Sequence, residues 1–190
     1  MNRRNPKLNV LLVLALFAGT AVYADDNVKL EEGFTWIFDG KTLKGWEGNL
    51  KWFRVQDGAI IAGSLNQDIP NNEFLCTTKS YGDFELRLQA RLVGENYRNA
   101  GIQFRSKRIE NHHEVIGYQA DMGQGWWGCL YDESRRRTML AKPKPGVIDK
   151  ILKKNDWNHY EIRCEGPRIR LYINGTQTID FTEADPKIPL

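Results

Sequence analysis

Cysteine is scarce in this sequence, and no motif links it to a metal. The three cysteines are Cys76, Cys129 and Cys164, and none of them forms a CxxC pair or a Cys/His spacing typical of zinc. An odd number leaves at least one thiol without an intramolecular partner. We therefore expect small buried side chains with at most one disulfide, and the pattern excludes a disulfide-rich scaffold and a structural zinc domain.

Long apolar runs are also absent, with a single exception at the start of the chain. Residues 8–23 are largely apolar, follow Arg3, Arg4 and Lys7, and end in the small residues around Ala24. This pattern is typical of a secretory signal peptide and is too short to span a bilayer comfortably. We expect cleavage before Asp25, export to the periplasm or the extracellular space, and no membrane attachment afterwards.

The rest of the chain has no excess of positive charge. The whole sequence has 27 Lys and Arg against 24 Asp and Glu, and three of the basic residues lie in residues 1–24, so 24 of each sign remain. A neutral domain lacks the basic surface of nucleic-acid-binding proteins, so we expect no nucleic-acid partner. Residues 25–190 suffice for one domain with one core.

What the sequence does contain is alternation of apolar and polar residues, which indicates strands. The clearest case is 84–92, where five apolar residues alternate with Glu, Arg and Gln. Similar patterns occupy 101–106, 158–166 and the hairpin around Asn174-Gly175. We also expect a strand at 34–38 and one helical turn near 149–153. With no helix of ordinary length, the sequence predicts an all-β sandwich of two antiparallel sheets, a jelly roll with a concave polar face.

Polar and aromatic side chains concentrate in the stretch from Val115 to Arg137. Gln119 and Asp121 are two residues apart and therefore share one face of a strand, and Tyr131 and Glu133 do the same on the next strand. Trp126 and Trp127 lie in the glycine-rich turn between them. Indoles beside polar groups often bind the apolar face of a sugar, but the alternative is a twisted hairpin whose tryptophans cover the core.

The order of motifs resembles that of the secreted 3-keto-disaccharide hydrolases, a family also described as 3-keto-glucoside lyases and 3-keto-2-hydroxyglucal hydratases. The motifs are WIFDGKTLKGW, DFELRLQARL, AGIQFRS, GYQAD, GCLYDESRR, WNHYEIRCEG and LYING, and together they extend over residues 33–182. The resemblance implies a concanavalin-like jelly roll.

Two positions depart from the family pattern. Gly117 stands where many members have an acidic residue, two places before Gln119. Members also continue past the last hairpin into a strand or two bearing a Gln and a His, whereas this sequence ends at Leu190. The resemblance therefore implies a C-terminally truncated domain that lacks its last strand or strands.

The resemblance implies cleavage of a sugar whose carbon 3 is already a ketone. The ketone acidifies the hydrogen on carbon 2, a base removes it, and the enolate expels the glycosidic oxygen from carbon 1. Water then adds across the resulting glucal. Such a site needs a base, an electrophile for the enolate oxygen and an acid for the leaving group. A divalent metal could be the electrophile, and a sugar-oxidising dehydrogenase would act upstream.

Several residues are candidates for these roles. We expect Arg105 to hold the enolate oxygen, Glu133 to act as the base and Tyr131 to donate to the leaving oxygen, with Asp121 as a fourth catalytic residue or a metal ligand. The expected substrate-binding residues are Gln103, Gln119, Trp126, Trp127 and Arg135. Each also has an ordinary interpretation as a surface ion pair or a solvated strand face.

Other interpretations remain open at this stage. A lectin-like carbohydrate-binding module without catalysis would use the tryptophans for stacking and the carboxylates only to orient hydroxyls. A laminarinase-like glycosidase is disfavoured because no ExDxE pattern occurs. A metal site at His112, His113 and Glu114 is disfavoured because neighbouring histidines point apart on a strand and no HExxH spacing occurs.

Overall fold

Strands dominate the computed structural model, which describes residues 11–15, 30–94 and 99–189. The strands are β1 (Leu11–Ala15), β2 (Trp46–Glu47), β3 (Phe53–Gln56), β4 (Ala59–Gly63), β5 (Cys76–Thr77), β6 (Phe84–Val93), β7 (Asn99–Arg108), β8 (Val115–Gly123), β9 (Leu130–Glu133), β10 (Thr138–Ala141), β11 (Asn158–Glu165), β12 (Arg168–Ile173) and β13 (Thr176–Thr182). The helical turn expected near 149–153 is α1 (Val147–Ile151). No helix in these ranges is long and apolar enough to cross a membrane.

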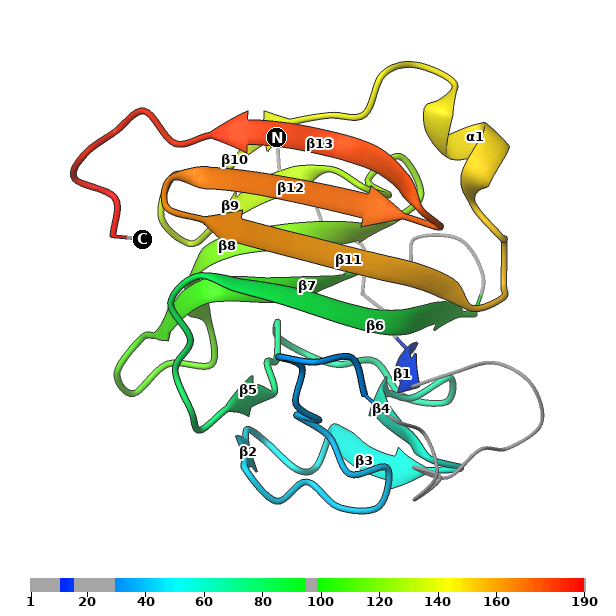
Figure 1. Ribbon diagram of the computed structural model, residues 1–190. Helices are drawn as coiled ribbons and strands as arrows, with labels where there is room; N and C mark the ends of the chain where they lie inside the picture. Colours follow the sequence, from blue (N-terminus) through cyan, green and yellow to red (C-terminus); the bar gives the residue numbers. More distant parts are fainter. Residues whose placement is uncertain (1–10, 16–29, 95–98, 190) are drawn as a thin grey trace, which may run out of the picture.

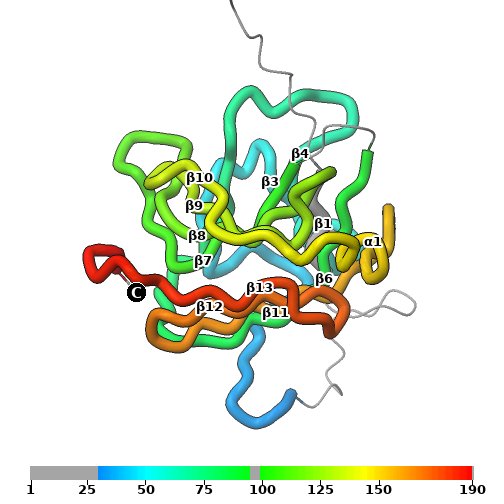
Figure 2. The backbone as a smooth tube through the Cα atoms, turned by 90° about the horizontal axis from the view of Figure 1, so that it is seen from above, coloured from blue at the N-terminus to red at the C-terminus, as the bar shows by residue number. Residues whose placement is uncertain are grey.

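The strands form two main sheets, as Figure 1 shows. The larger sheet has the order β13-β12-β11-β6-β1-β4-β3 and the smaller one the order β10-β9-β8-β7, while β2 and β5 form a short ribbon. Seen from above, β11–β13 and β7–β10 run as two stacked layers (Figure 2). The predicted jelly-roll sandwich of antiparallel sheets is confirmed.

The expected signal peptide overlaps one strand of the larger sheet. β1 pairs with β4 on one side and with β6 on the other, both antiparallel. The rest of residues 1–24 lies outside the described ranges. Cleavage before Asp25 stays a prediction, and so does export.

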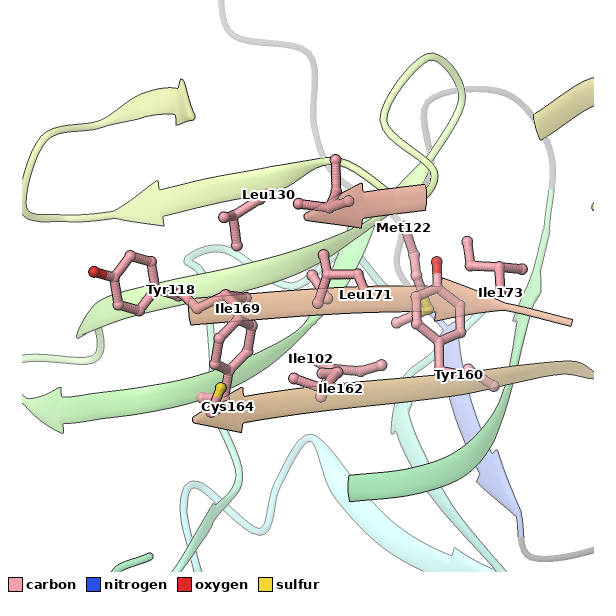
Figure 3. Packing of buried hydrophobic residues seen from close by; sticks show 14 of the residues in the cluster. Ile102, Tyr118, Met122, Leu130, Tyr160, Ile162, Cys164, Ile169, Leu171 and Ile173 are labelled. Carbon is pink, nitrogen blue, oxygen red and sulfur yellow. The ribbon is translucent and has the colours of Figure 1, made fainter. Parts of the chain in front are cut away.

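The core lies between the two sheets. β6 places Leu86 opposite Ile162 and Leu88 opposite Tyr160, and these β11 side chains are fully buried. From the smaller sheet, the fully buried Tyr118 joins the same cluster, and Figure 3 shows how the two sets meet. The alternation in the sequence therefore identified the inward faces of β6 and β11 and of residues 118–121 of β8 correctly, because burial of one face is what the period-2 pattern encodes.

One expected strand is absent. Residues 34–38 form no strand and contain a single bend at Ile37. The Arg87 guanidinium of β6 lies 4.3 Å from the ring centroid of Phe34, and Trp36 is exposed. The apolar composition of this segment therefore overstated its tendency to pair.

The loop between β4 and β5 is tied to the far end of the smaller sheet. The Arg108 guanidinium at the end of β7 donates to the carbonyl oxygens of Glu47 and Phe74, at 2.8 and 3.2 Å. The His113 ring nitrogen Nδ1 lies 2.9 Å from the carbonyl oxygen of Asn72. These contacts hold residues 64–75 next to β7, where they form one wall of the cavity described below.

Candidate functional site

The polar face of the smaller sheet brings five of the predicted residues together. The ladder pairs Gln103 of β7 with Gln119 of β8, and Gln119 with Tyr131 of β9. On one side of this row Asp121 faces Gly101, and on the opposite side Glu133 faces Gly117. Because Tyr118 and Ala120 of β8 point into the core, alternation places Gln119 and Asp121 on the opposite face.

Four of the polar side chains on this face form a continuous hydrogen-bonded row. Ser106 Oγ donates to Gln103 Oε1 at 2.8 Å, and it also lies 3.0 Å from the Phe104 carbonyl oxygen. Gln103 Nε2 donates to Gln119 Oε1 at 3.1 Å, and Gln119 Nε2 donates to Asp121 Oδ1 at 2.5 Å. We call Ser106, Gln103, Gln119 and Asp121 the amide relay.

Two glycines make room for the relay. A Cβ at Gly101 would lie 2.3 Å from the side-chain carbons of Gln119, and a Cβ at Gly117 would lie 2.2 Å from Ser106 Oγ. Any larger residue would displace these side chains, since real Cβ contacts are never so short. Gly117, the position at which the sequence departs from the family pattern, therefore accommodates Ser106.

Both carboxyl groups on this face are harder to ionise than usual. Burial raises the pKa of Asp121 to about 7, although the hydrogen bond from Gln119 opposes this, and the charge of Glu133 adds to it. Burial also raises the pKa of Glu133, with a further contribution from Glu114. Burial is also the largest cause of the raised pKa of Tyr131. Carboxyl groups with raised pKa values on one face of a sheet suit proton transfer.

The polar face opens on a cavity of about 1410 Å³. Gln103, Gln119 and Glu133 are among its lining residues, whereas Asp121, only 2% exposed, lies behind Gln119. Residues between 69 and 77 and residues of β6, both apolar and polar, complete its lining. The volume exceeds that of ordinary small-molecule sites and is large enough for a disaccharide.

Arg105 does not project from this face as expected. A register shift between Phe104 and Lys107 marks a β-bulge, and Arg105 has a φ of 46°. The bulge turns its side chain toward the larger sheet, where the guanidinium donates to Asp83 and to the Gly166 carbonyl at 2.8 and 2.6 Å. Only 2% of the side chain is exposed. The prediction that Gln103 and Arg105 share a face is wrong, because a bulge breaks the alternation.

The two tryptophans take different positions. Trp126 is 39% exposed, and its ring meets that of Tyr131 edge-on at 6.4 Å, next to the polar face. Trp127 is half-buried and packs against Tyr160 in the core, with ring centroids 6.3 Å apart. Trp126 therefore presents its ring to solvent beside Tyr131, whereas Trp127 packs in the core, and neither is among the residues that line the cavity described above. Substrate stacking on these two rings stays a prediction.

Arg135 belongs to the other side of the sheet. Its Nε donates to Asp132 Oδ1 at 2.9 Å, and its guanidinium lies 4.7 Å from the centroid of the Tyr118 ring. Both partners are fully buried on the core side. The β9–β10 turn thus directs the Arg135 side chain away from Glu133, and Arg135 is not among the residues that line the cavity. Its expected role in substrate binding stays a prediction.

The donor atoms on the polar face do not fit a divalent metal. The Oε1 atoms of Gln103 and Gln119 already accept hydrogen bonds within the relay. Within residues 11–15, 30–94 and 99–189, no group of three or more His, Cys, Asp or Glu side chains is arranged to hold an ion. His112 and His113 stack on each other at 4.2 Å, away from such an arrangement. We therefore assign no catalytic step to a metal.

Sequence reasoning missed two contributors to this face: Ser106, which caps the relay, and Gly101, which makes room beneath Gln119. Glu114 was considered only beside His112 and His113, whereas the structure shows that its charge contributes to the raised pKa of Glu133. The glycine beside Ile102 in GIQFRS was the available signal, because an isolated glycine in a strand often marks a close approach of another group. Ser106 gave no such signal, since its position depends on the bulge.

Comparison with known proteins gives the family. The model of the 3-keto-alpha-glucoside-1,2-lyase-like domain matches residues 33–189. A crystal structure from Parabacteroides distasonis ATCC 8503, described as a candidate glycosyl hydrolase, superimposes with a TM-score of 0.58 at 17% identity over 80% of this chain and 74% of that chain. At that identity the likeness shows the shared fold alone. No curated protein matches the chain. With a match over most of its length, the chain belongs to the 3-keto-alpha-glucoside-1,2-lyase-like domain family.

Proposed function

We propose that the protein cleaves 3-keto-glucosides by elimination followed by hydration, and that the cavity beside β7–β9 is its active site. The family membership supports a carbohydrate-active function. The observation that carries the specific chemistry is the pairing of Glu133, which lines the cavity with a raised pKa, with Tyr131 on the same strand face. Elimination next to a ketone requires a base beside the substrate. The ionised form of a carboxyl group with a raised pKa is such a base.

Glu133 acts as the base. Its carboxylate takes the proton from carbon 2, and the electron pair of that C–H bond moves toward the ketone oxygen to give an enolate. The enolate then re-forms the ketone and makes the carbon 1–carbon 2 double bond as the bond from carbon 1 to the glycosidic oxygen breaks. Burial favours the protonated form of Glu133, so the ionised form is a stronger base than an exposed glutamate. In the second step, water adds its oxygen to carbon 1 and gives its released proton to the Tyr131 phenolate, while Glu133 returns the first proton to carbon 2. The net result is hydrolysis.

Tyr131 supplies the proton for the departing glycosidic oxygen. It is separated from Glu133 by one residue on the same strand, so the two side chains lie on one face. Its pKa is raised by burial and by the charge of Glu133, which keeps the phenol protonated and able to donate. The two residues then divide the work between base and acid, as neighbouring groups with separated pKa values do elsewhere.

The first experiment uses a 3-keto-α-glucoside labelled with deuterium at carbon 2. Elimination breaks the bond from carbon 2 to deuterium and forms the glucal, whereas a direct glycosidase does neither. We expect the glucal to be detected by mass spectrometry, cleavage to be slower than for the unlabelled substrate, and no cleavage of the unoxidised glucoside. Product release without an isotope effect and without the glucal would exclude elimination, and an unchanged keto substrate would exclude the enzyme function.

Variants assign the two roles. Glu133→Gln should reduce turnover about 10²- to 10⁴-fold, the usual contribution of a general base. The matched control is Glu165→Gln, a carboxylate 65% exposed that pairs with Arg170 on the other sheet. Tyr131→Phe should slow a 3-ketodisaccharide strongly and a nitrophenyl 3-keto-glucoside little, because nitrophenolate leaves without a proton. Equal effects on both substrates would remove Tyr131 from the acid role.

A lectin-like module without catalysis is the second candidate, and the exposed Trp126 favours it. Its indole stands beside the polar face on the edge of Tyr131, an arrangement that suits stacking on a sugar. Binding of an unoxidised oligosaccharide without turnover of the keto form would support this function over the first.

The substrate chemistry also defines the setting of the reaction. A 3-keto-glucoside must come from an enzyme that oxidises the carbon-3 hydroxyl, so we propose a sugar-oxidising dehydrogenase upstream. The predicted leader places this protein in the periplasm or outside the cell. Fractionation of the expressing cells, with detection of the chain cleaved before Asp25, tests that location.

A further inference from the structure

We propose that Asp121 is a positioning residue that fixes the amide orientations of Gln119 and Gln103, so that Gln103 offers an N–H group to the enolate oxygen of the substrate. The proposal rests on the proposed function for its second half, since only elimination creates an enolate. Gln103 would then take the role that was expected of Arg105, whose side chain the bulge in β7 turns away from the polar face.

The direction of the relay follows from the chemistry of its last member. An ionised carboxylate can only accept hydrogen bonds, so Gln119 must direct its NH₂ group to Asp121, as it does at 2.5 Å. The Gln119 carbonyl oxygen then points to Gln103 and requires a donor, which Gln103 Nε2 supplies at 3.1 Å. The Gln103 carbonyl oxygen in turn accepts from Ser106. One buried charge therefore orients two amides.

The orientation matters at Gln103 because this residue lines the cavity. Its Nε2 carries two hydrogens, and the bond to Gln119 uses one of them. The second hydrogen remains for a ligand. If the amide were reversed, an oxygen lone pair would occupy that place and would repel an enolate. A donor aimed at developing negative charge is the kind of group that stabilises such intermediates.

The exposure of the relay residues increases from the protein interior toward the cavity. Asp121 is 2% exposed and Gln119 is 7% exposed, whereas Gln103 is half-buried. Asp121 is therefore withheld from the substrate and acts through its neighbours. The space for this arrangement comes from Gly101, beneath the Gln119 side chain.

The charge state of Asp121 decides whether the relay has one direction, because a protonated carboxyl could donate as well as accept. The titratable groups around it are Glu133 and Tyr131 from β9, Cys129 from the preceding turn with Lys142 beside it, and Tyr160 from β11, whose hydroxyl donates to the Asp121 carbonyl. Of these, Glu133 raises the pKa of Asp121, and burial is the larger cause. We expect the relay to become fixed as the pH rises through about 7.

The orientation can be tested without substrate. Side-chain NH₂ resonances of glutamine, labelled with ¹⁵N and assigned by the variants Gln103→Ala and Gln119→Ala, should shift with a common midpoint near pH 7 in the wild type. The isosteric variant Asp121→Asn, shown to be folded by its backbone amide spectrum, should lose that transition. A Gln119 resonance that does not titrate, or that titrates equally in Asp121→Asn, overturns the proposal.

Kinetics then test the role in catalysis. Gln103→Ala should lower kcat for a 3-keto-α-glucoside about 10²-fold, and Asp121→Asn about 10-fold, with KM changing less than threefold in both. Asp121→Asn should also flatten the acid limb of the pH profile. Wild-type kcat and an unchanged acid limb in Asp121→Asn overturn the positioning role. An inactive wild type overturns the proposed function and the enolate role, while the NMR result still decides the orientation.

Discussion

The two faces of β9 carry acidic residues with opposite environments. Asp132 points to the core side and accepts from Arg135 and Arg136, and Arg136 also donates to Glu183 at 2.7 Å. We call Asp132, Arg135, Arg136 and Glu183 the ion-pair cluster. Glu133, the next residue, points to the polar face and lies in the field of Glu114 and of the buried Asp121.

The pKa values of the carboxyl groups on the two faces are shifted in opposite directions. The hydrogen bonds from Arg136 lower the pKa of Glu183 to about 2, even though burial opposes this. On the polar face, burial raises the pKa of Asp121 to about 7. The arginine partner keeps Glu183 ionised and links the end of β13 to the β9–β10 turn, whereas Asp121 and Glu133 have raised pKa values that suit proton transfer. Arginine partners, more than burial alone, therefore distinguish the acids of the two faces.

Breaking the ion-pair cluster should have the largest effect on stability. Asp132→Asn leaves two partly buried guanidinium groups without their shared partner, and removal of one member of a buried pair costs about 3–5 kcal/mol. Urea unfolding followed by tryptophan fluorescence measures the loss. The control Glu165→Gln, which affects an exposed pair, should change stability by less than about 1 kcal/mol. Equal losses in both variants would show that the cluster has no special role.

The two faces should also respond oppositely to pH. Asp121 has a folded pKa of about 7 against an ordinary 3.8, so the unfolded chain releases its proton first and stability falls as the pH rises. Between pH 5 and 7 the wild type should lose about 2 kcal/mol relative to Asp121→Asn. Glu183, with its pKa lowered from 4.5 to about 2, should lose its stabilising effect as the pH falls through that range.

These slopes are measured by urea unfolding at several pH values. The matched variant is Glu183→Gln, whose stability deficit against the wild type should be present at pH 6 and should shrink toward pH 3. If Asp121→Asn and the wild type change in parallel from pH 5 to 7, Asp121 does not titrate as a buried acid, and the distinction between the two faces fails.

The glycines of the polar face provide a smaller perturbation. Gly117→Ala places a Cβ where Ser106 Oγ now lies, and the resulting displacement should cost about 1–3 kcal/mol, as overpacking does. It should also weaken the relay and lower turnover. The double variant Gly117→Ala with Ser106→Gly removes only the hydroxyl contact, because the added Cβ would still lie 2.6 Å from Ser106 Cα and 2.8 Å from the Arg105 carbonyl oxygen. It should therefore recover only part of the stability and none of the relay. A loss in the double variant equal to that of Gly117→Ala alone would show that the hydroxyl contact adds nothing to the strain.

The architecture was readable from the sequence because burial imposes it. The β6 alternation and the Asn174-Gly175 turn each predicted the observed element, and the shared face of Gln119 with Asp121 followed from the same periodicity. Where apolar and polar residues alternate without interruption, the face of the sheet that each side chain occupies can be predicted. Residues 34–38 show the limit, because apolar composition alone does not show whether a segment pairs or merely packs on a surface.

The errors in the predicted site have local physical causes. Arg105 was assigned to the polar face by counting residues, and a single bulge with a φ of 46° reversed it. Arg135 was misplaced because a turn after β9 carries it to the core side, where Asp132 binds it. Bulges and turns change which face a residue occupies without changing hydrophobicity, so no periodic pattern reveals them.

The smallest predicted effect concerns the exposed tryptophan. Trp126→Ala should change stability by less than about 0.5 kcal/mol, as expected for a surface substitution, because its ring is 39% exposed and contacts Tyr131 only edge-on. It should nevertheless raise KM for a 3-keto-α-glucoside about three- to tenfold if the indole stacks on the sugar, with kcat little changed.

Trp127→Ala is the matched control, because that ring packs on Tyr160 in the core. It should lower the unfolding free energy by about 2 kcal/mol or more, as large-to-small core changes do, and leave KM unaltered. Initial rates of product formation at varied substrate concentration give KM for both variants, and their urea midpoints give the stability. The two measurements distinguish an indole that binds substrate from one that packs in the core. A KM effect confined to Trp127→Ala would reverse the assignment.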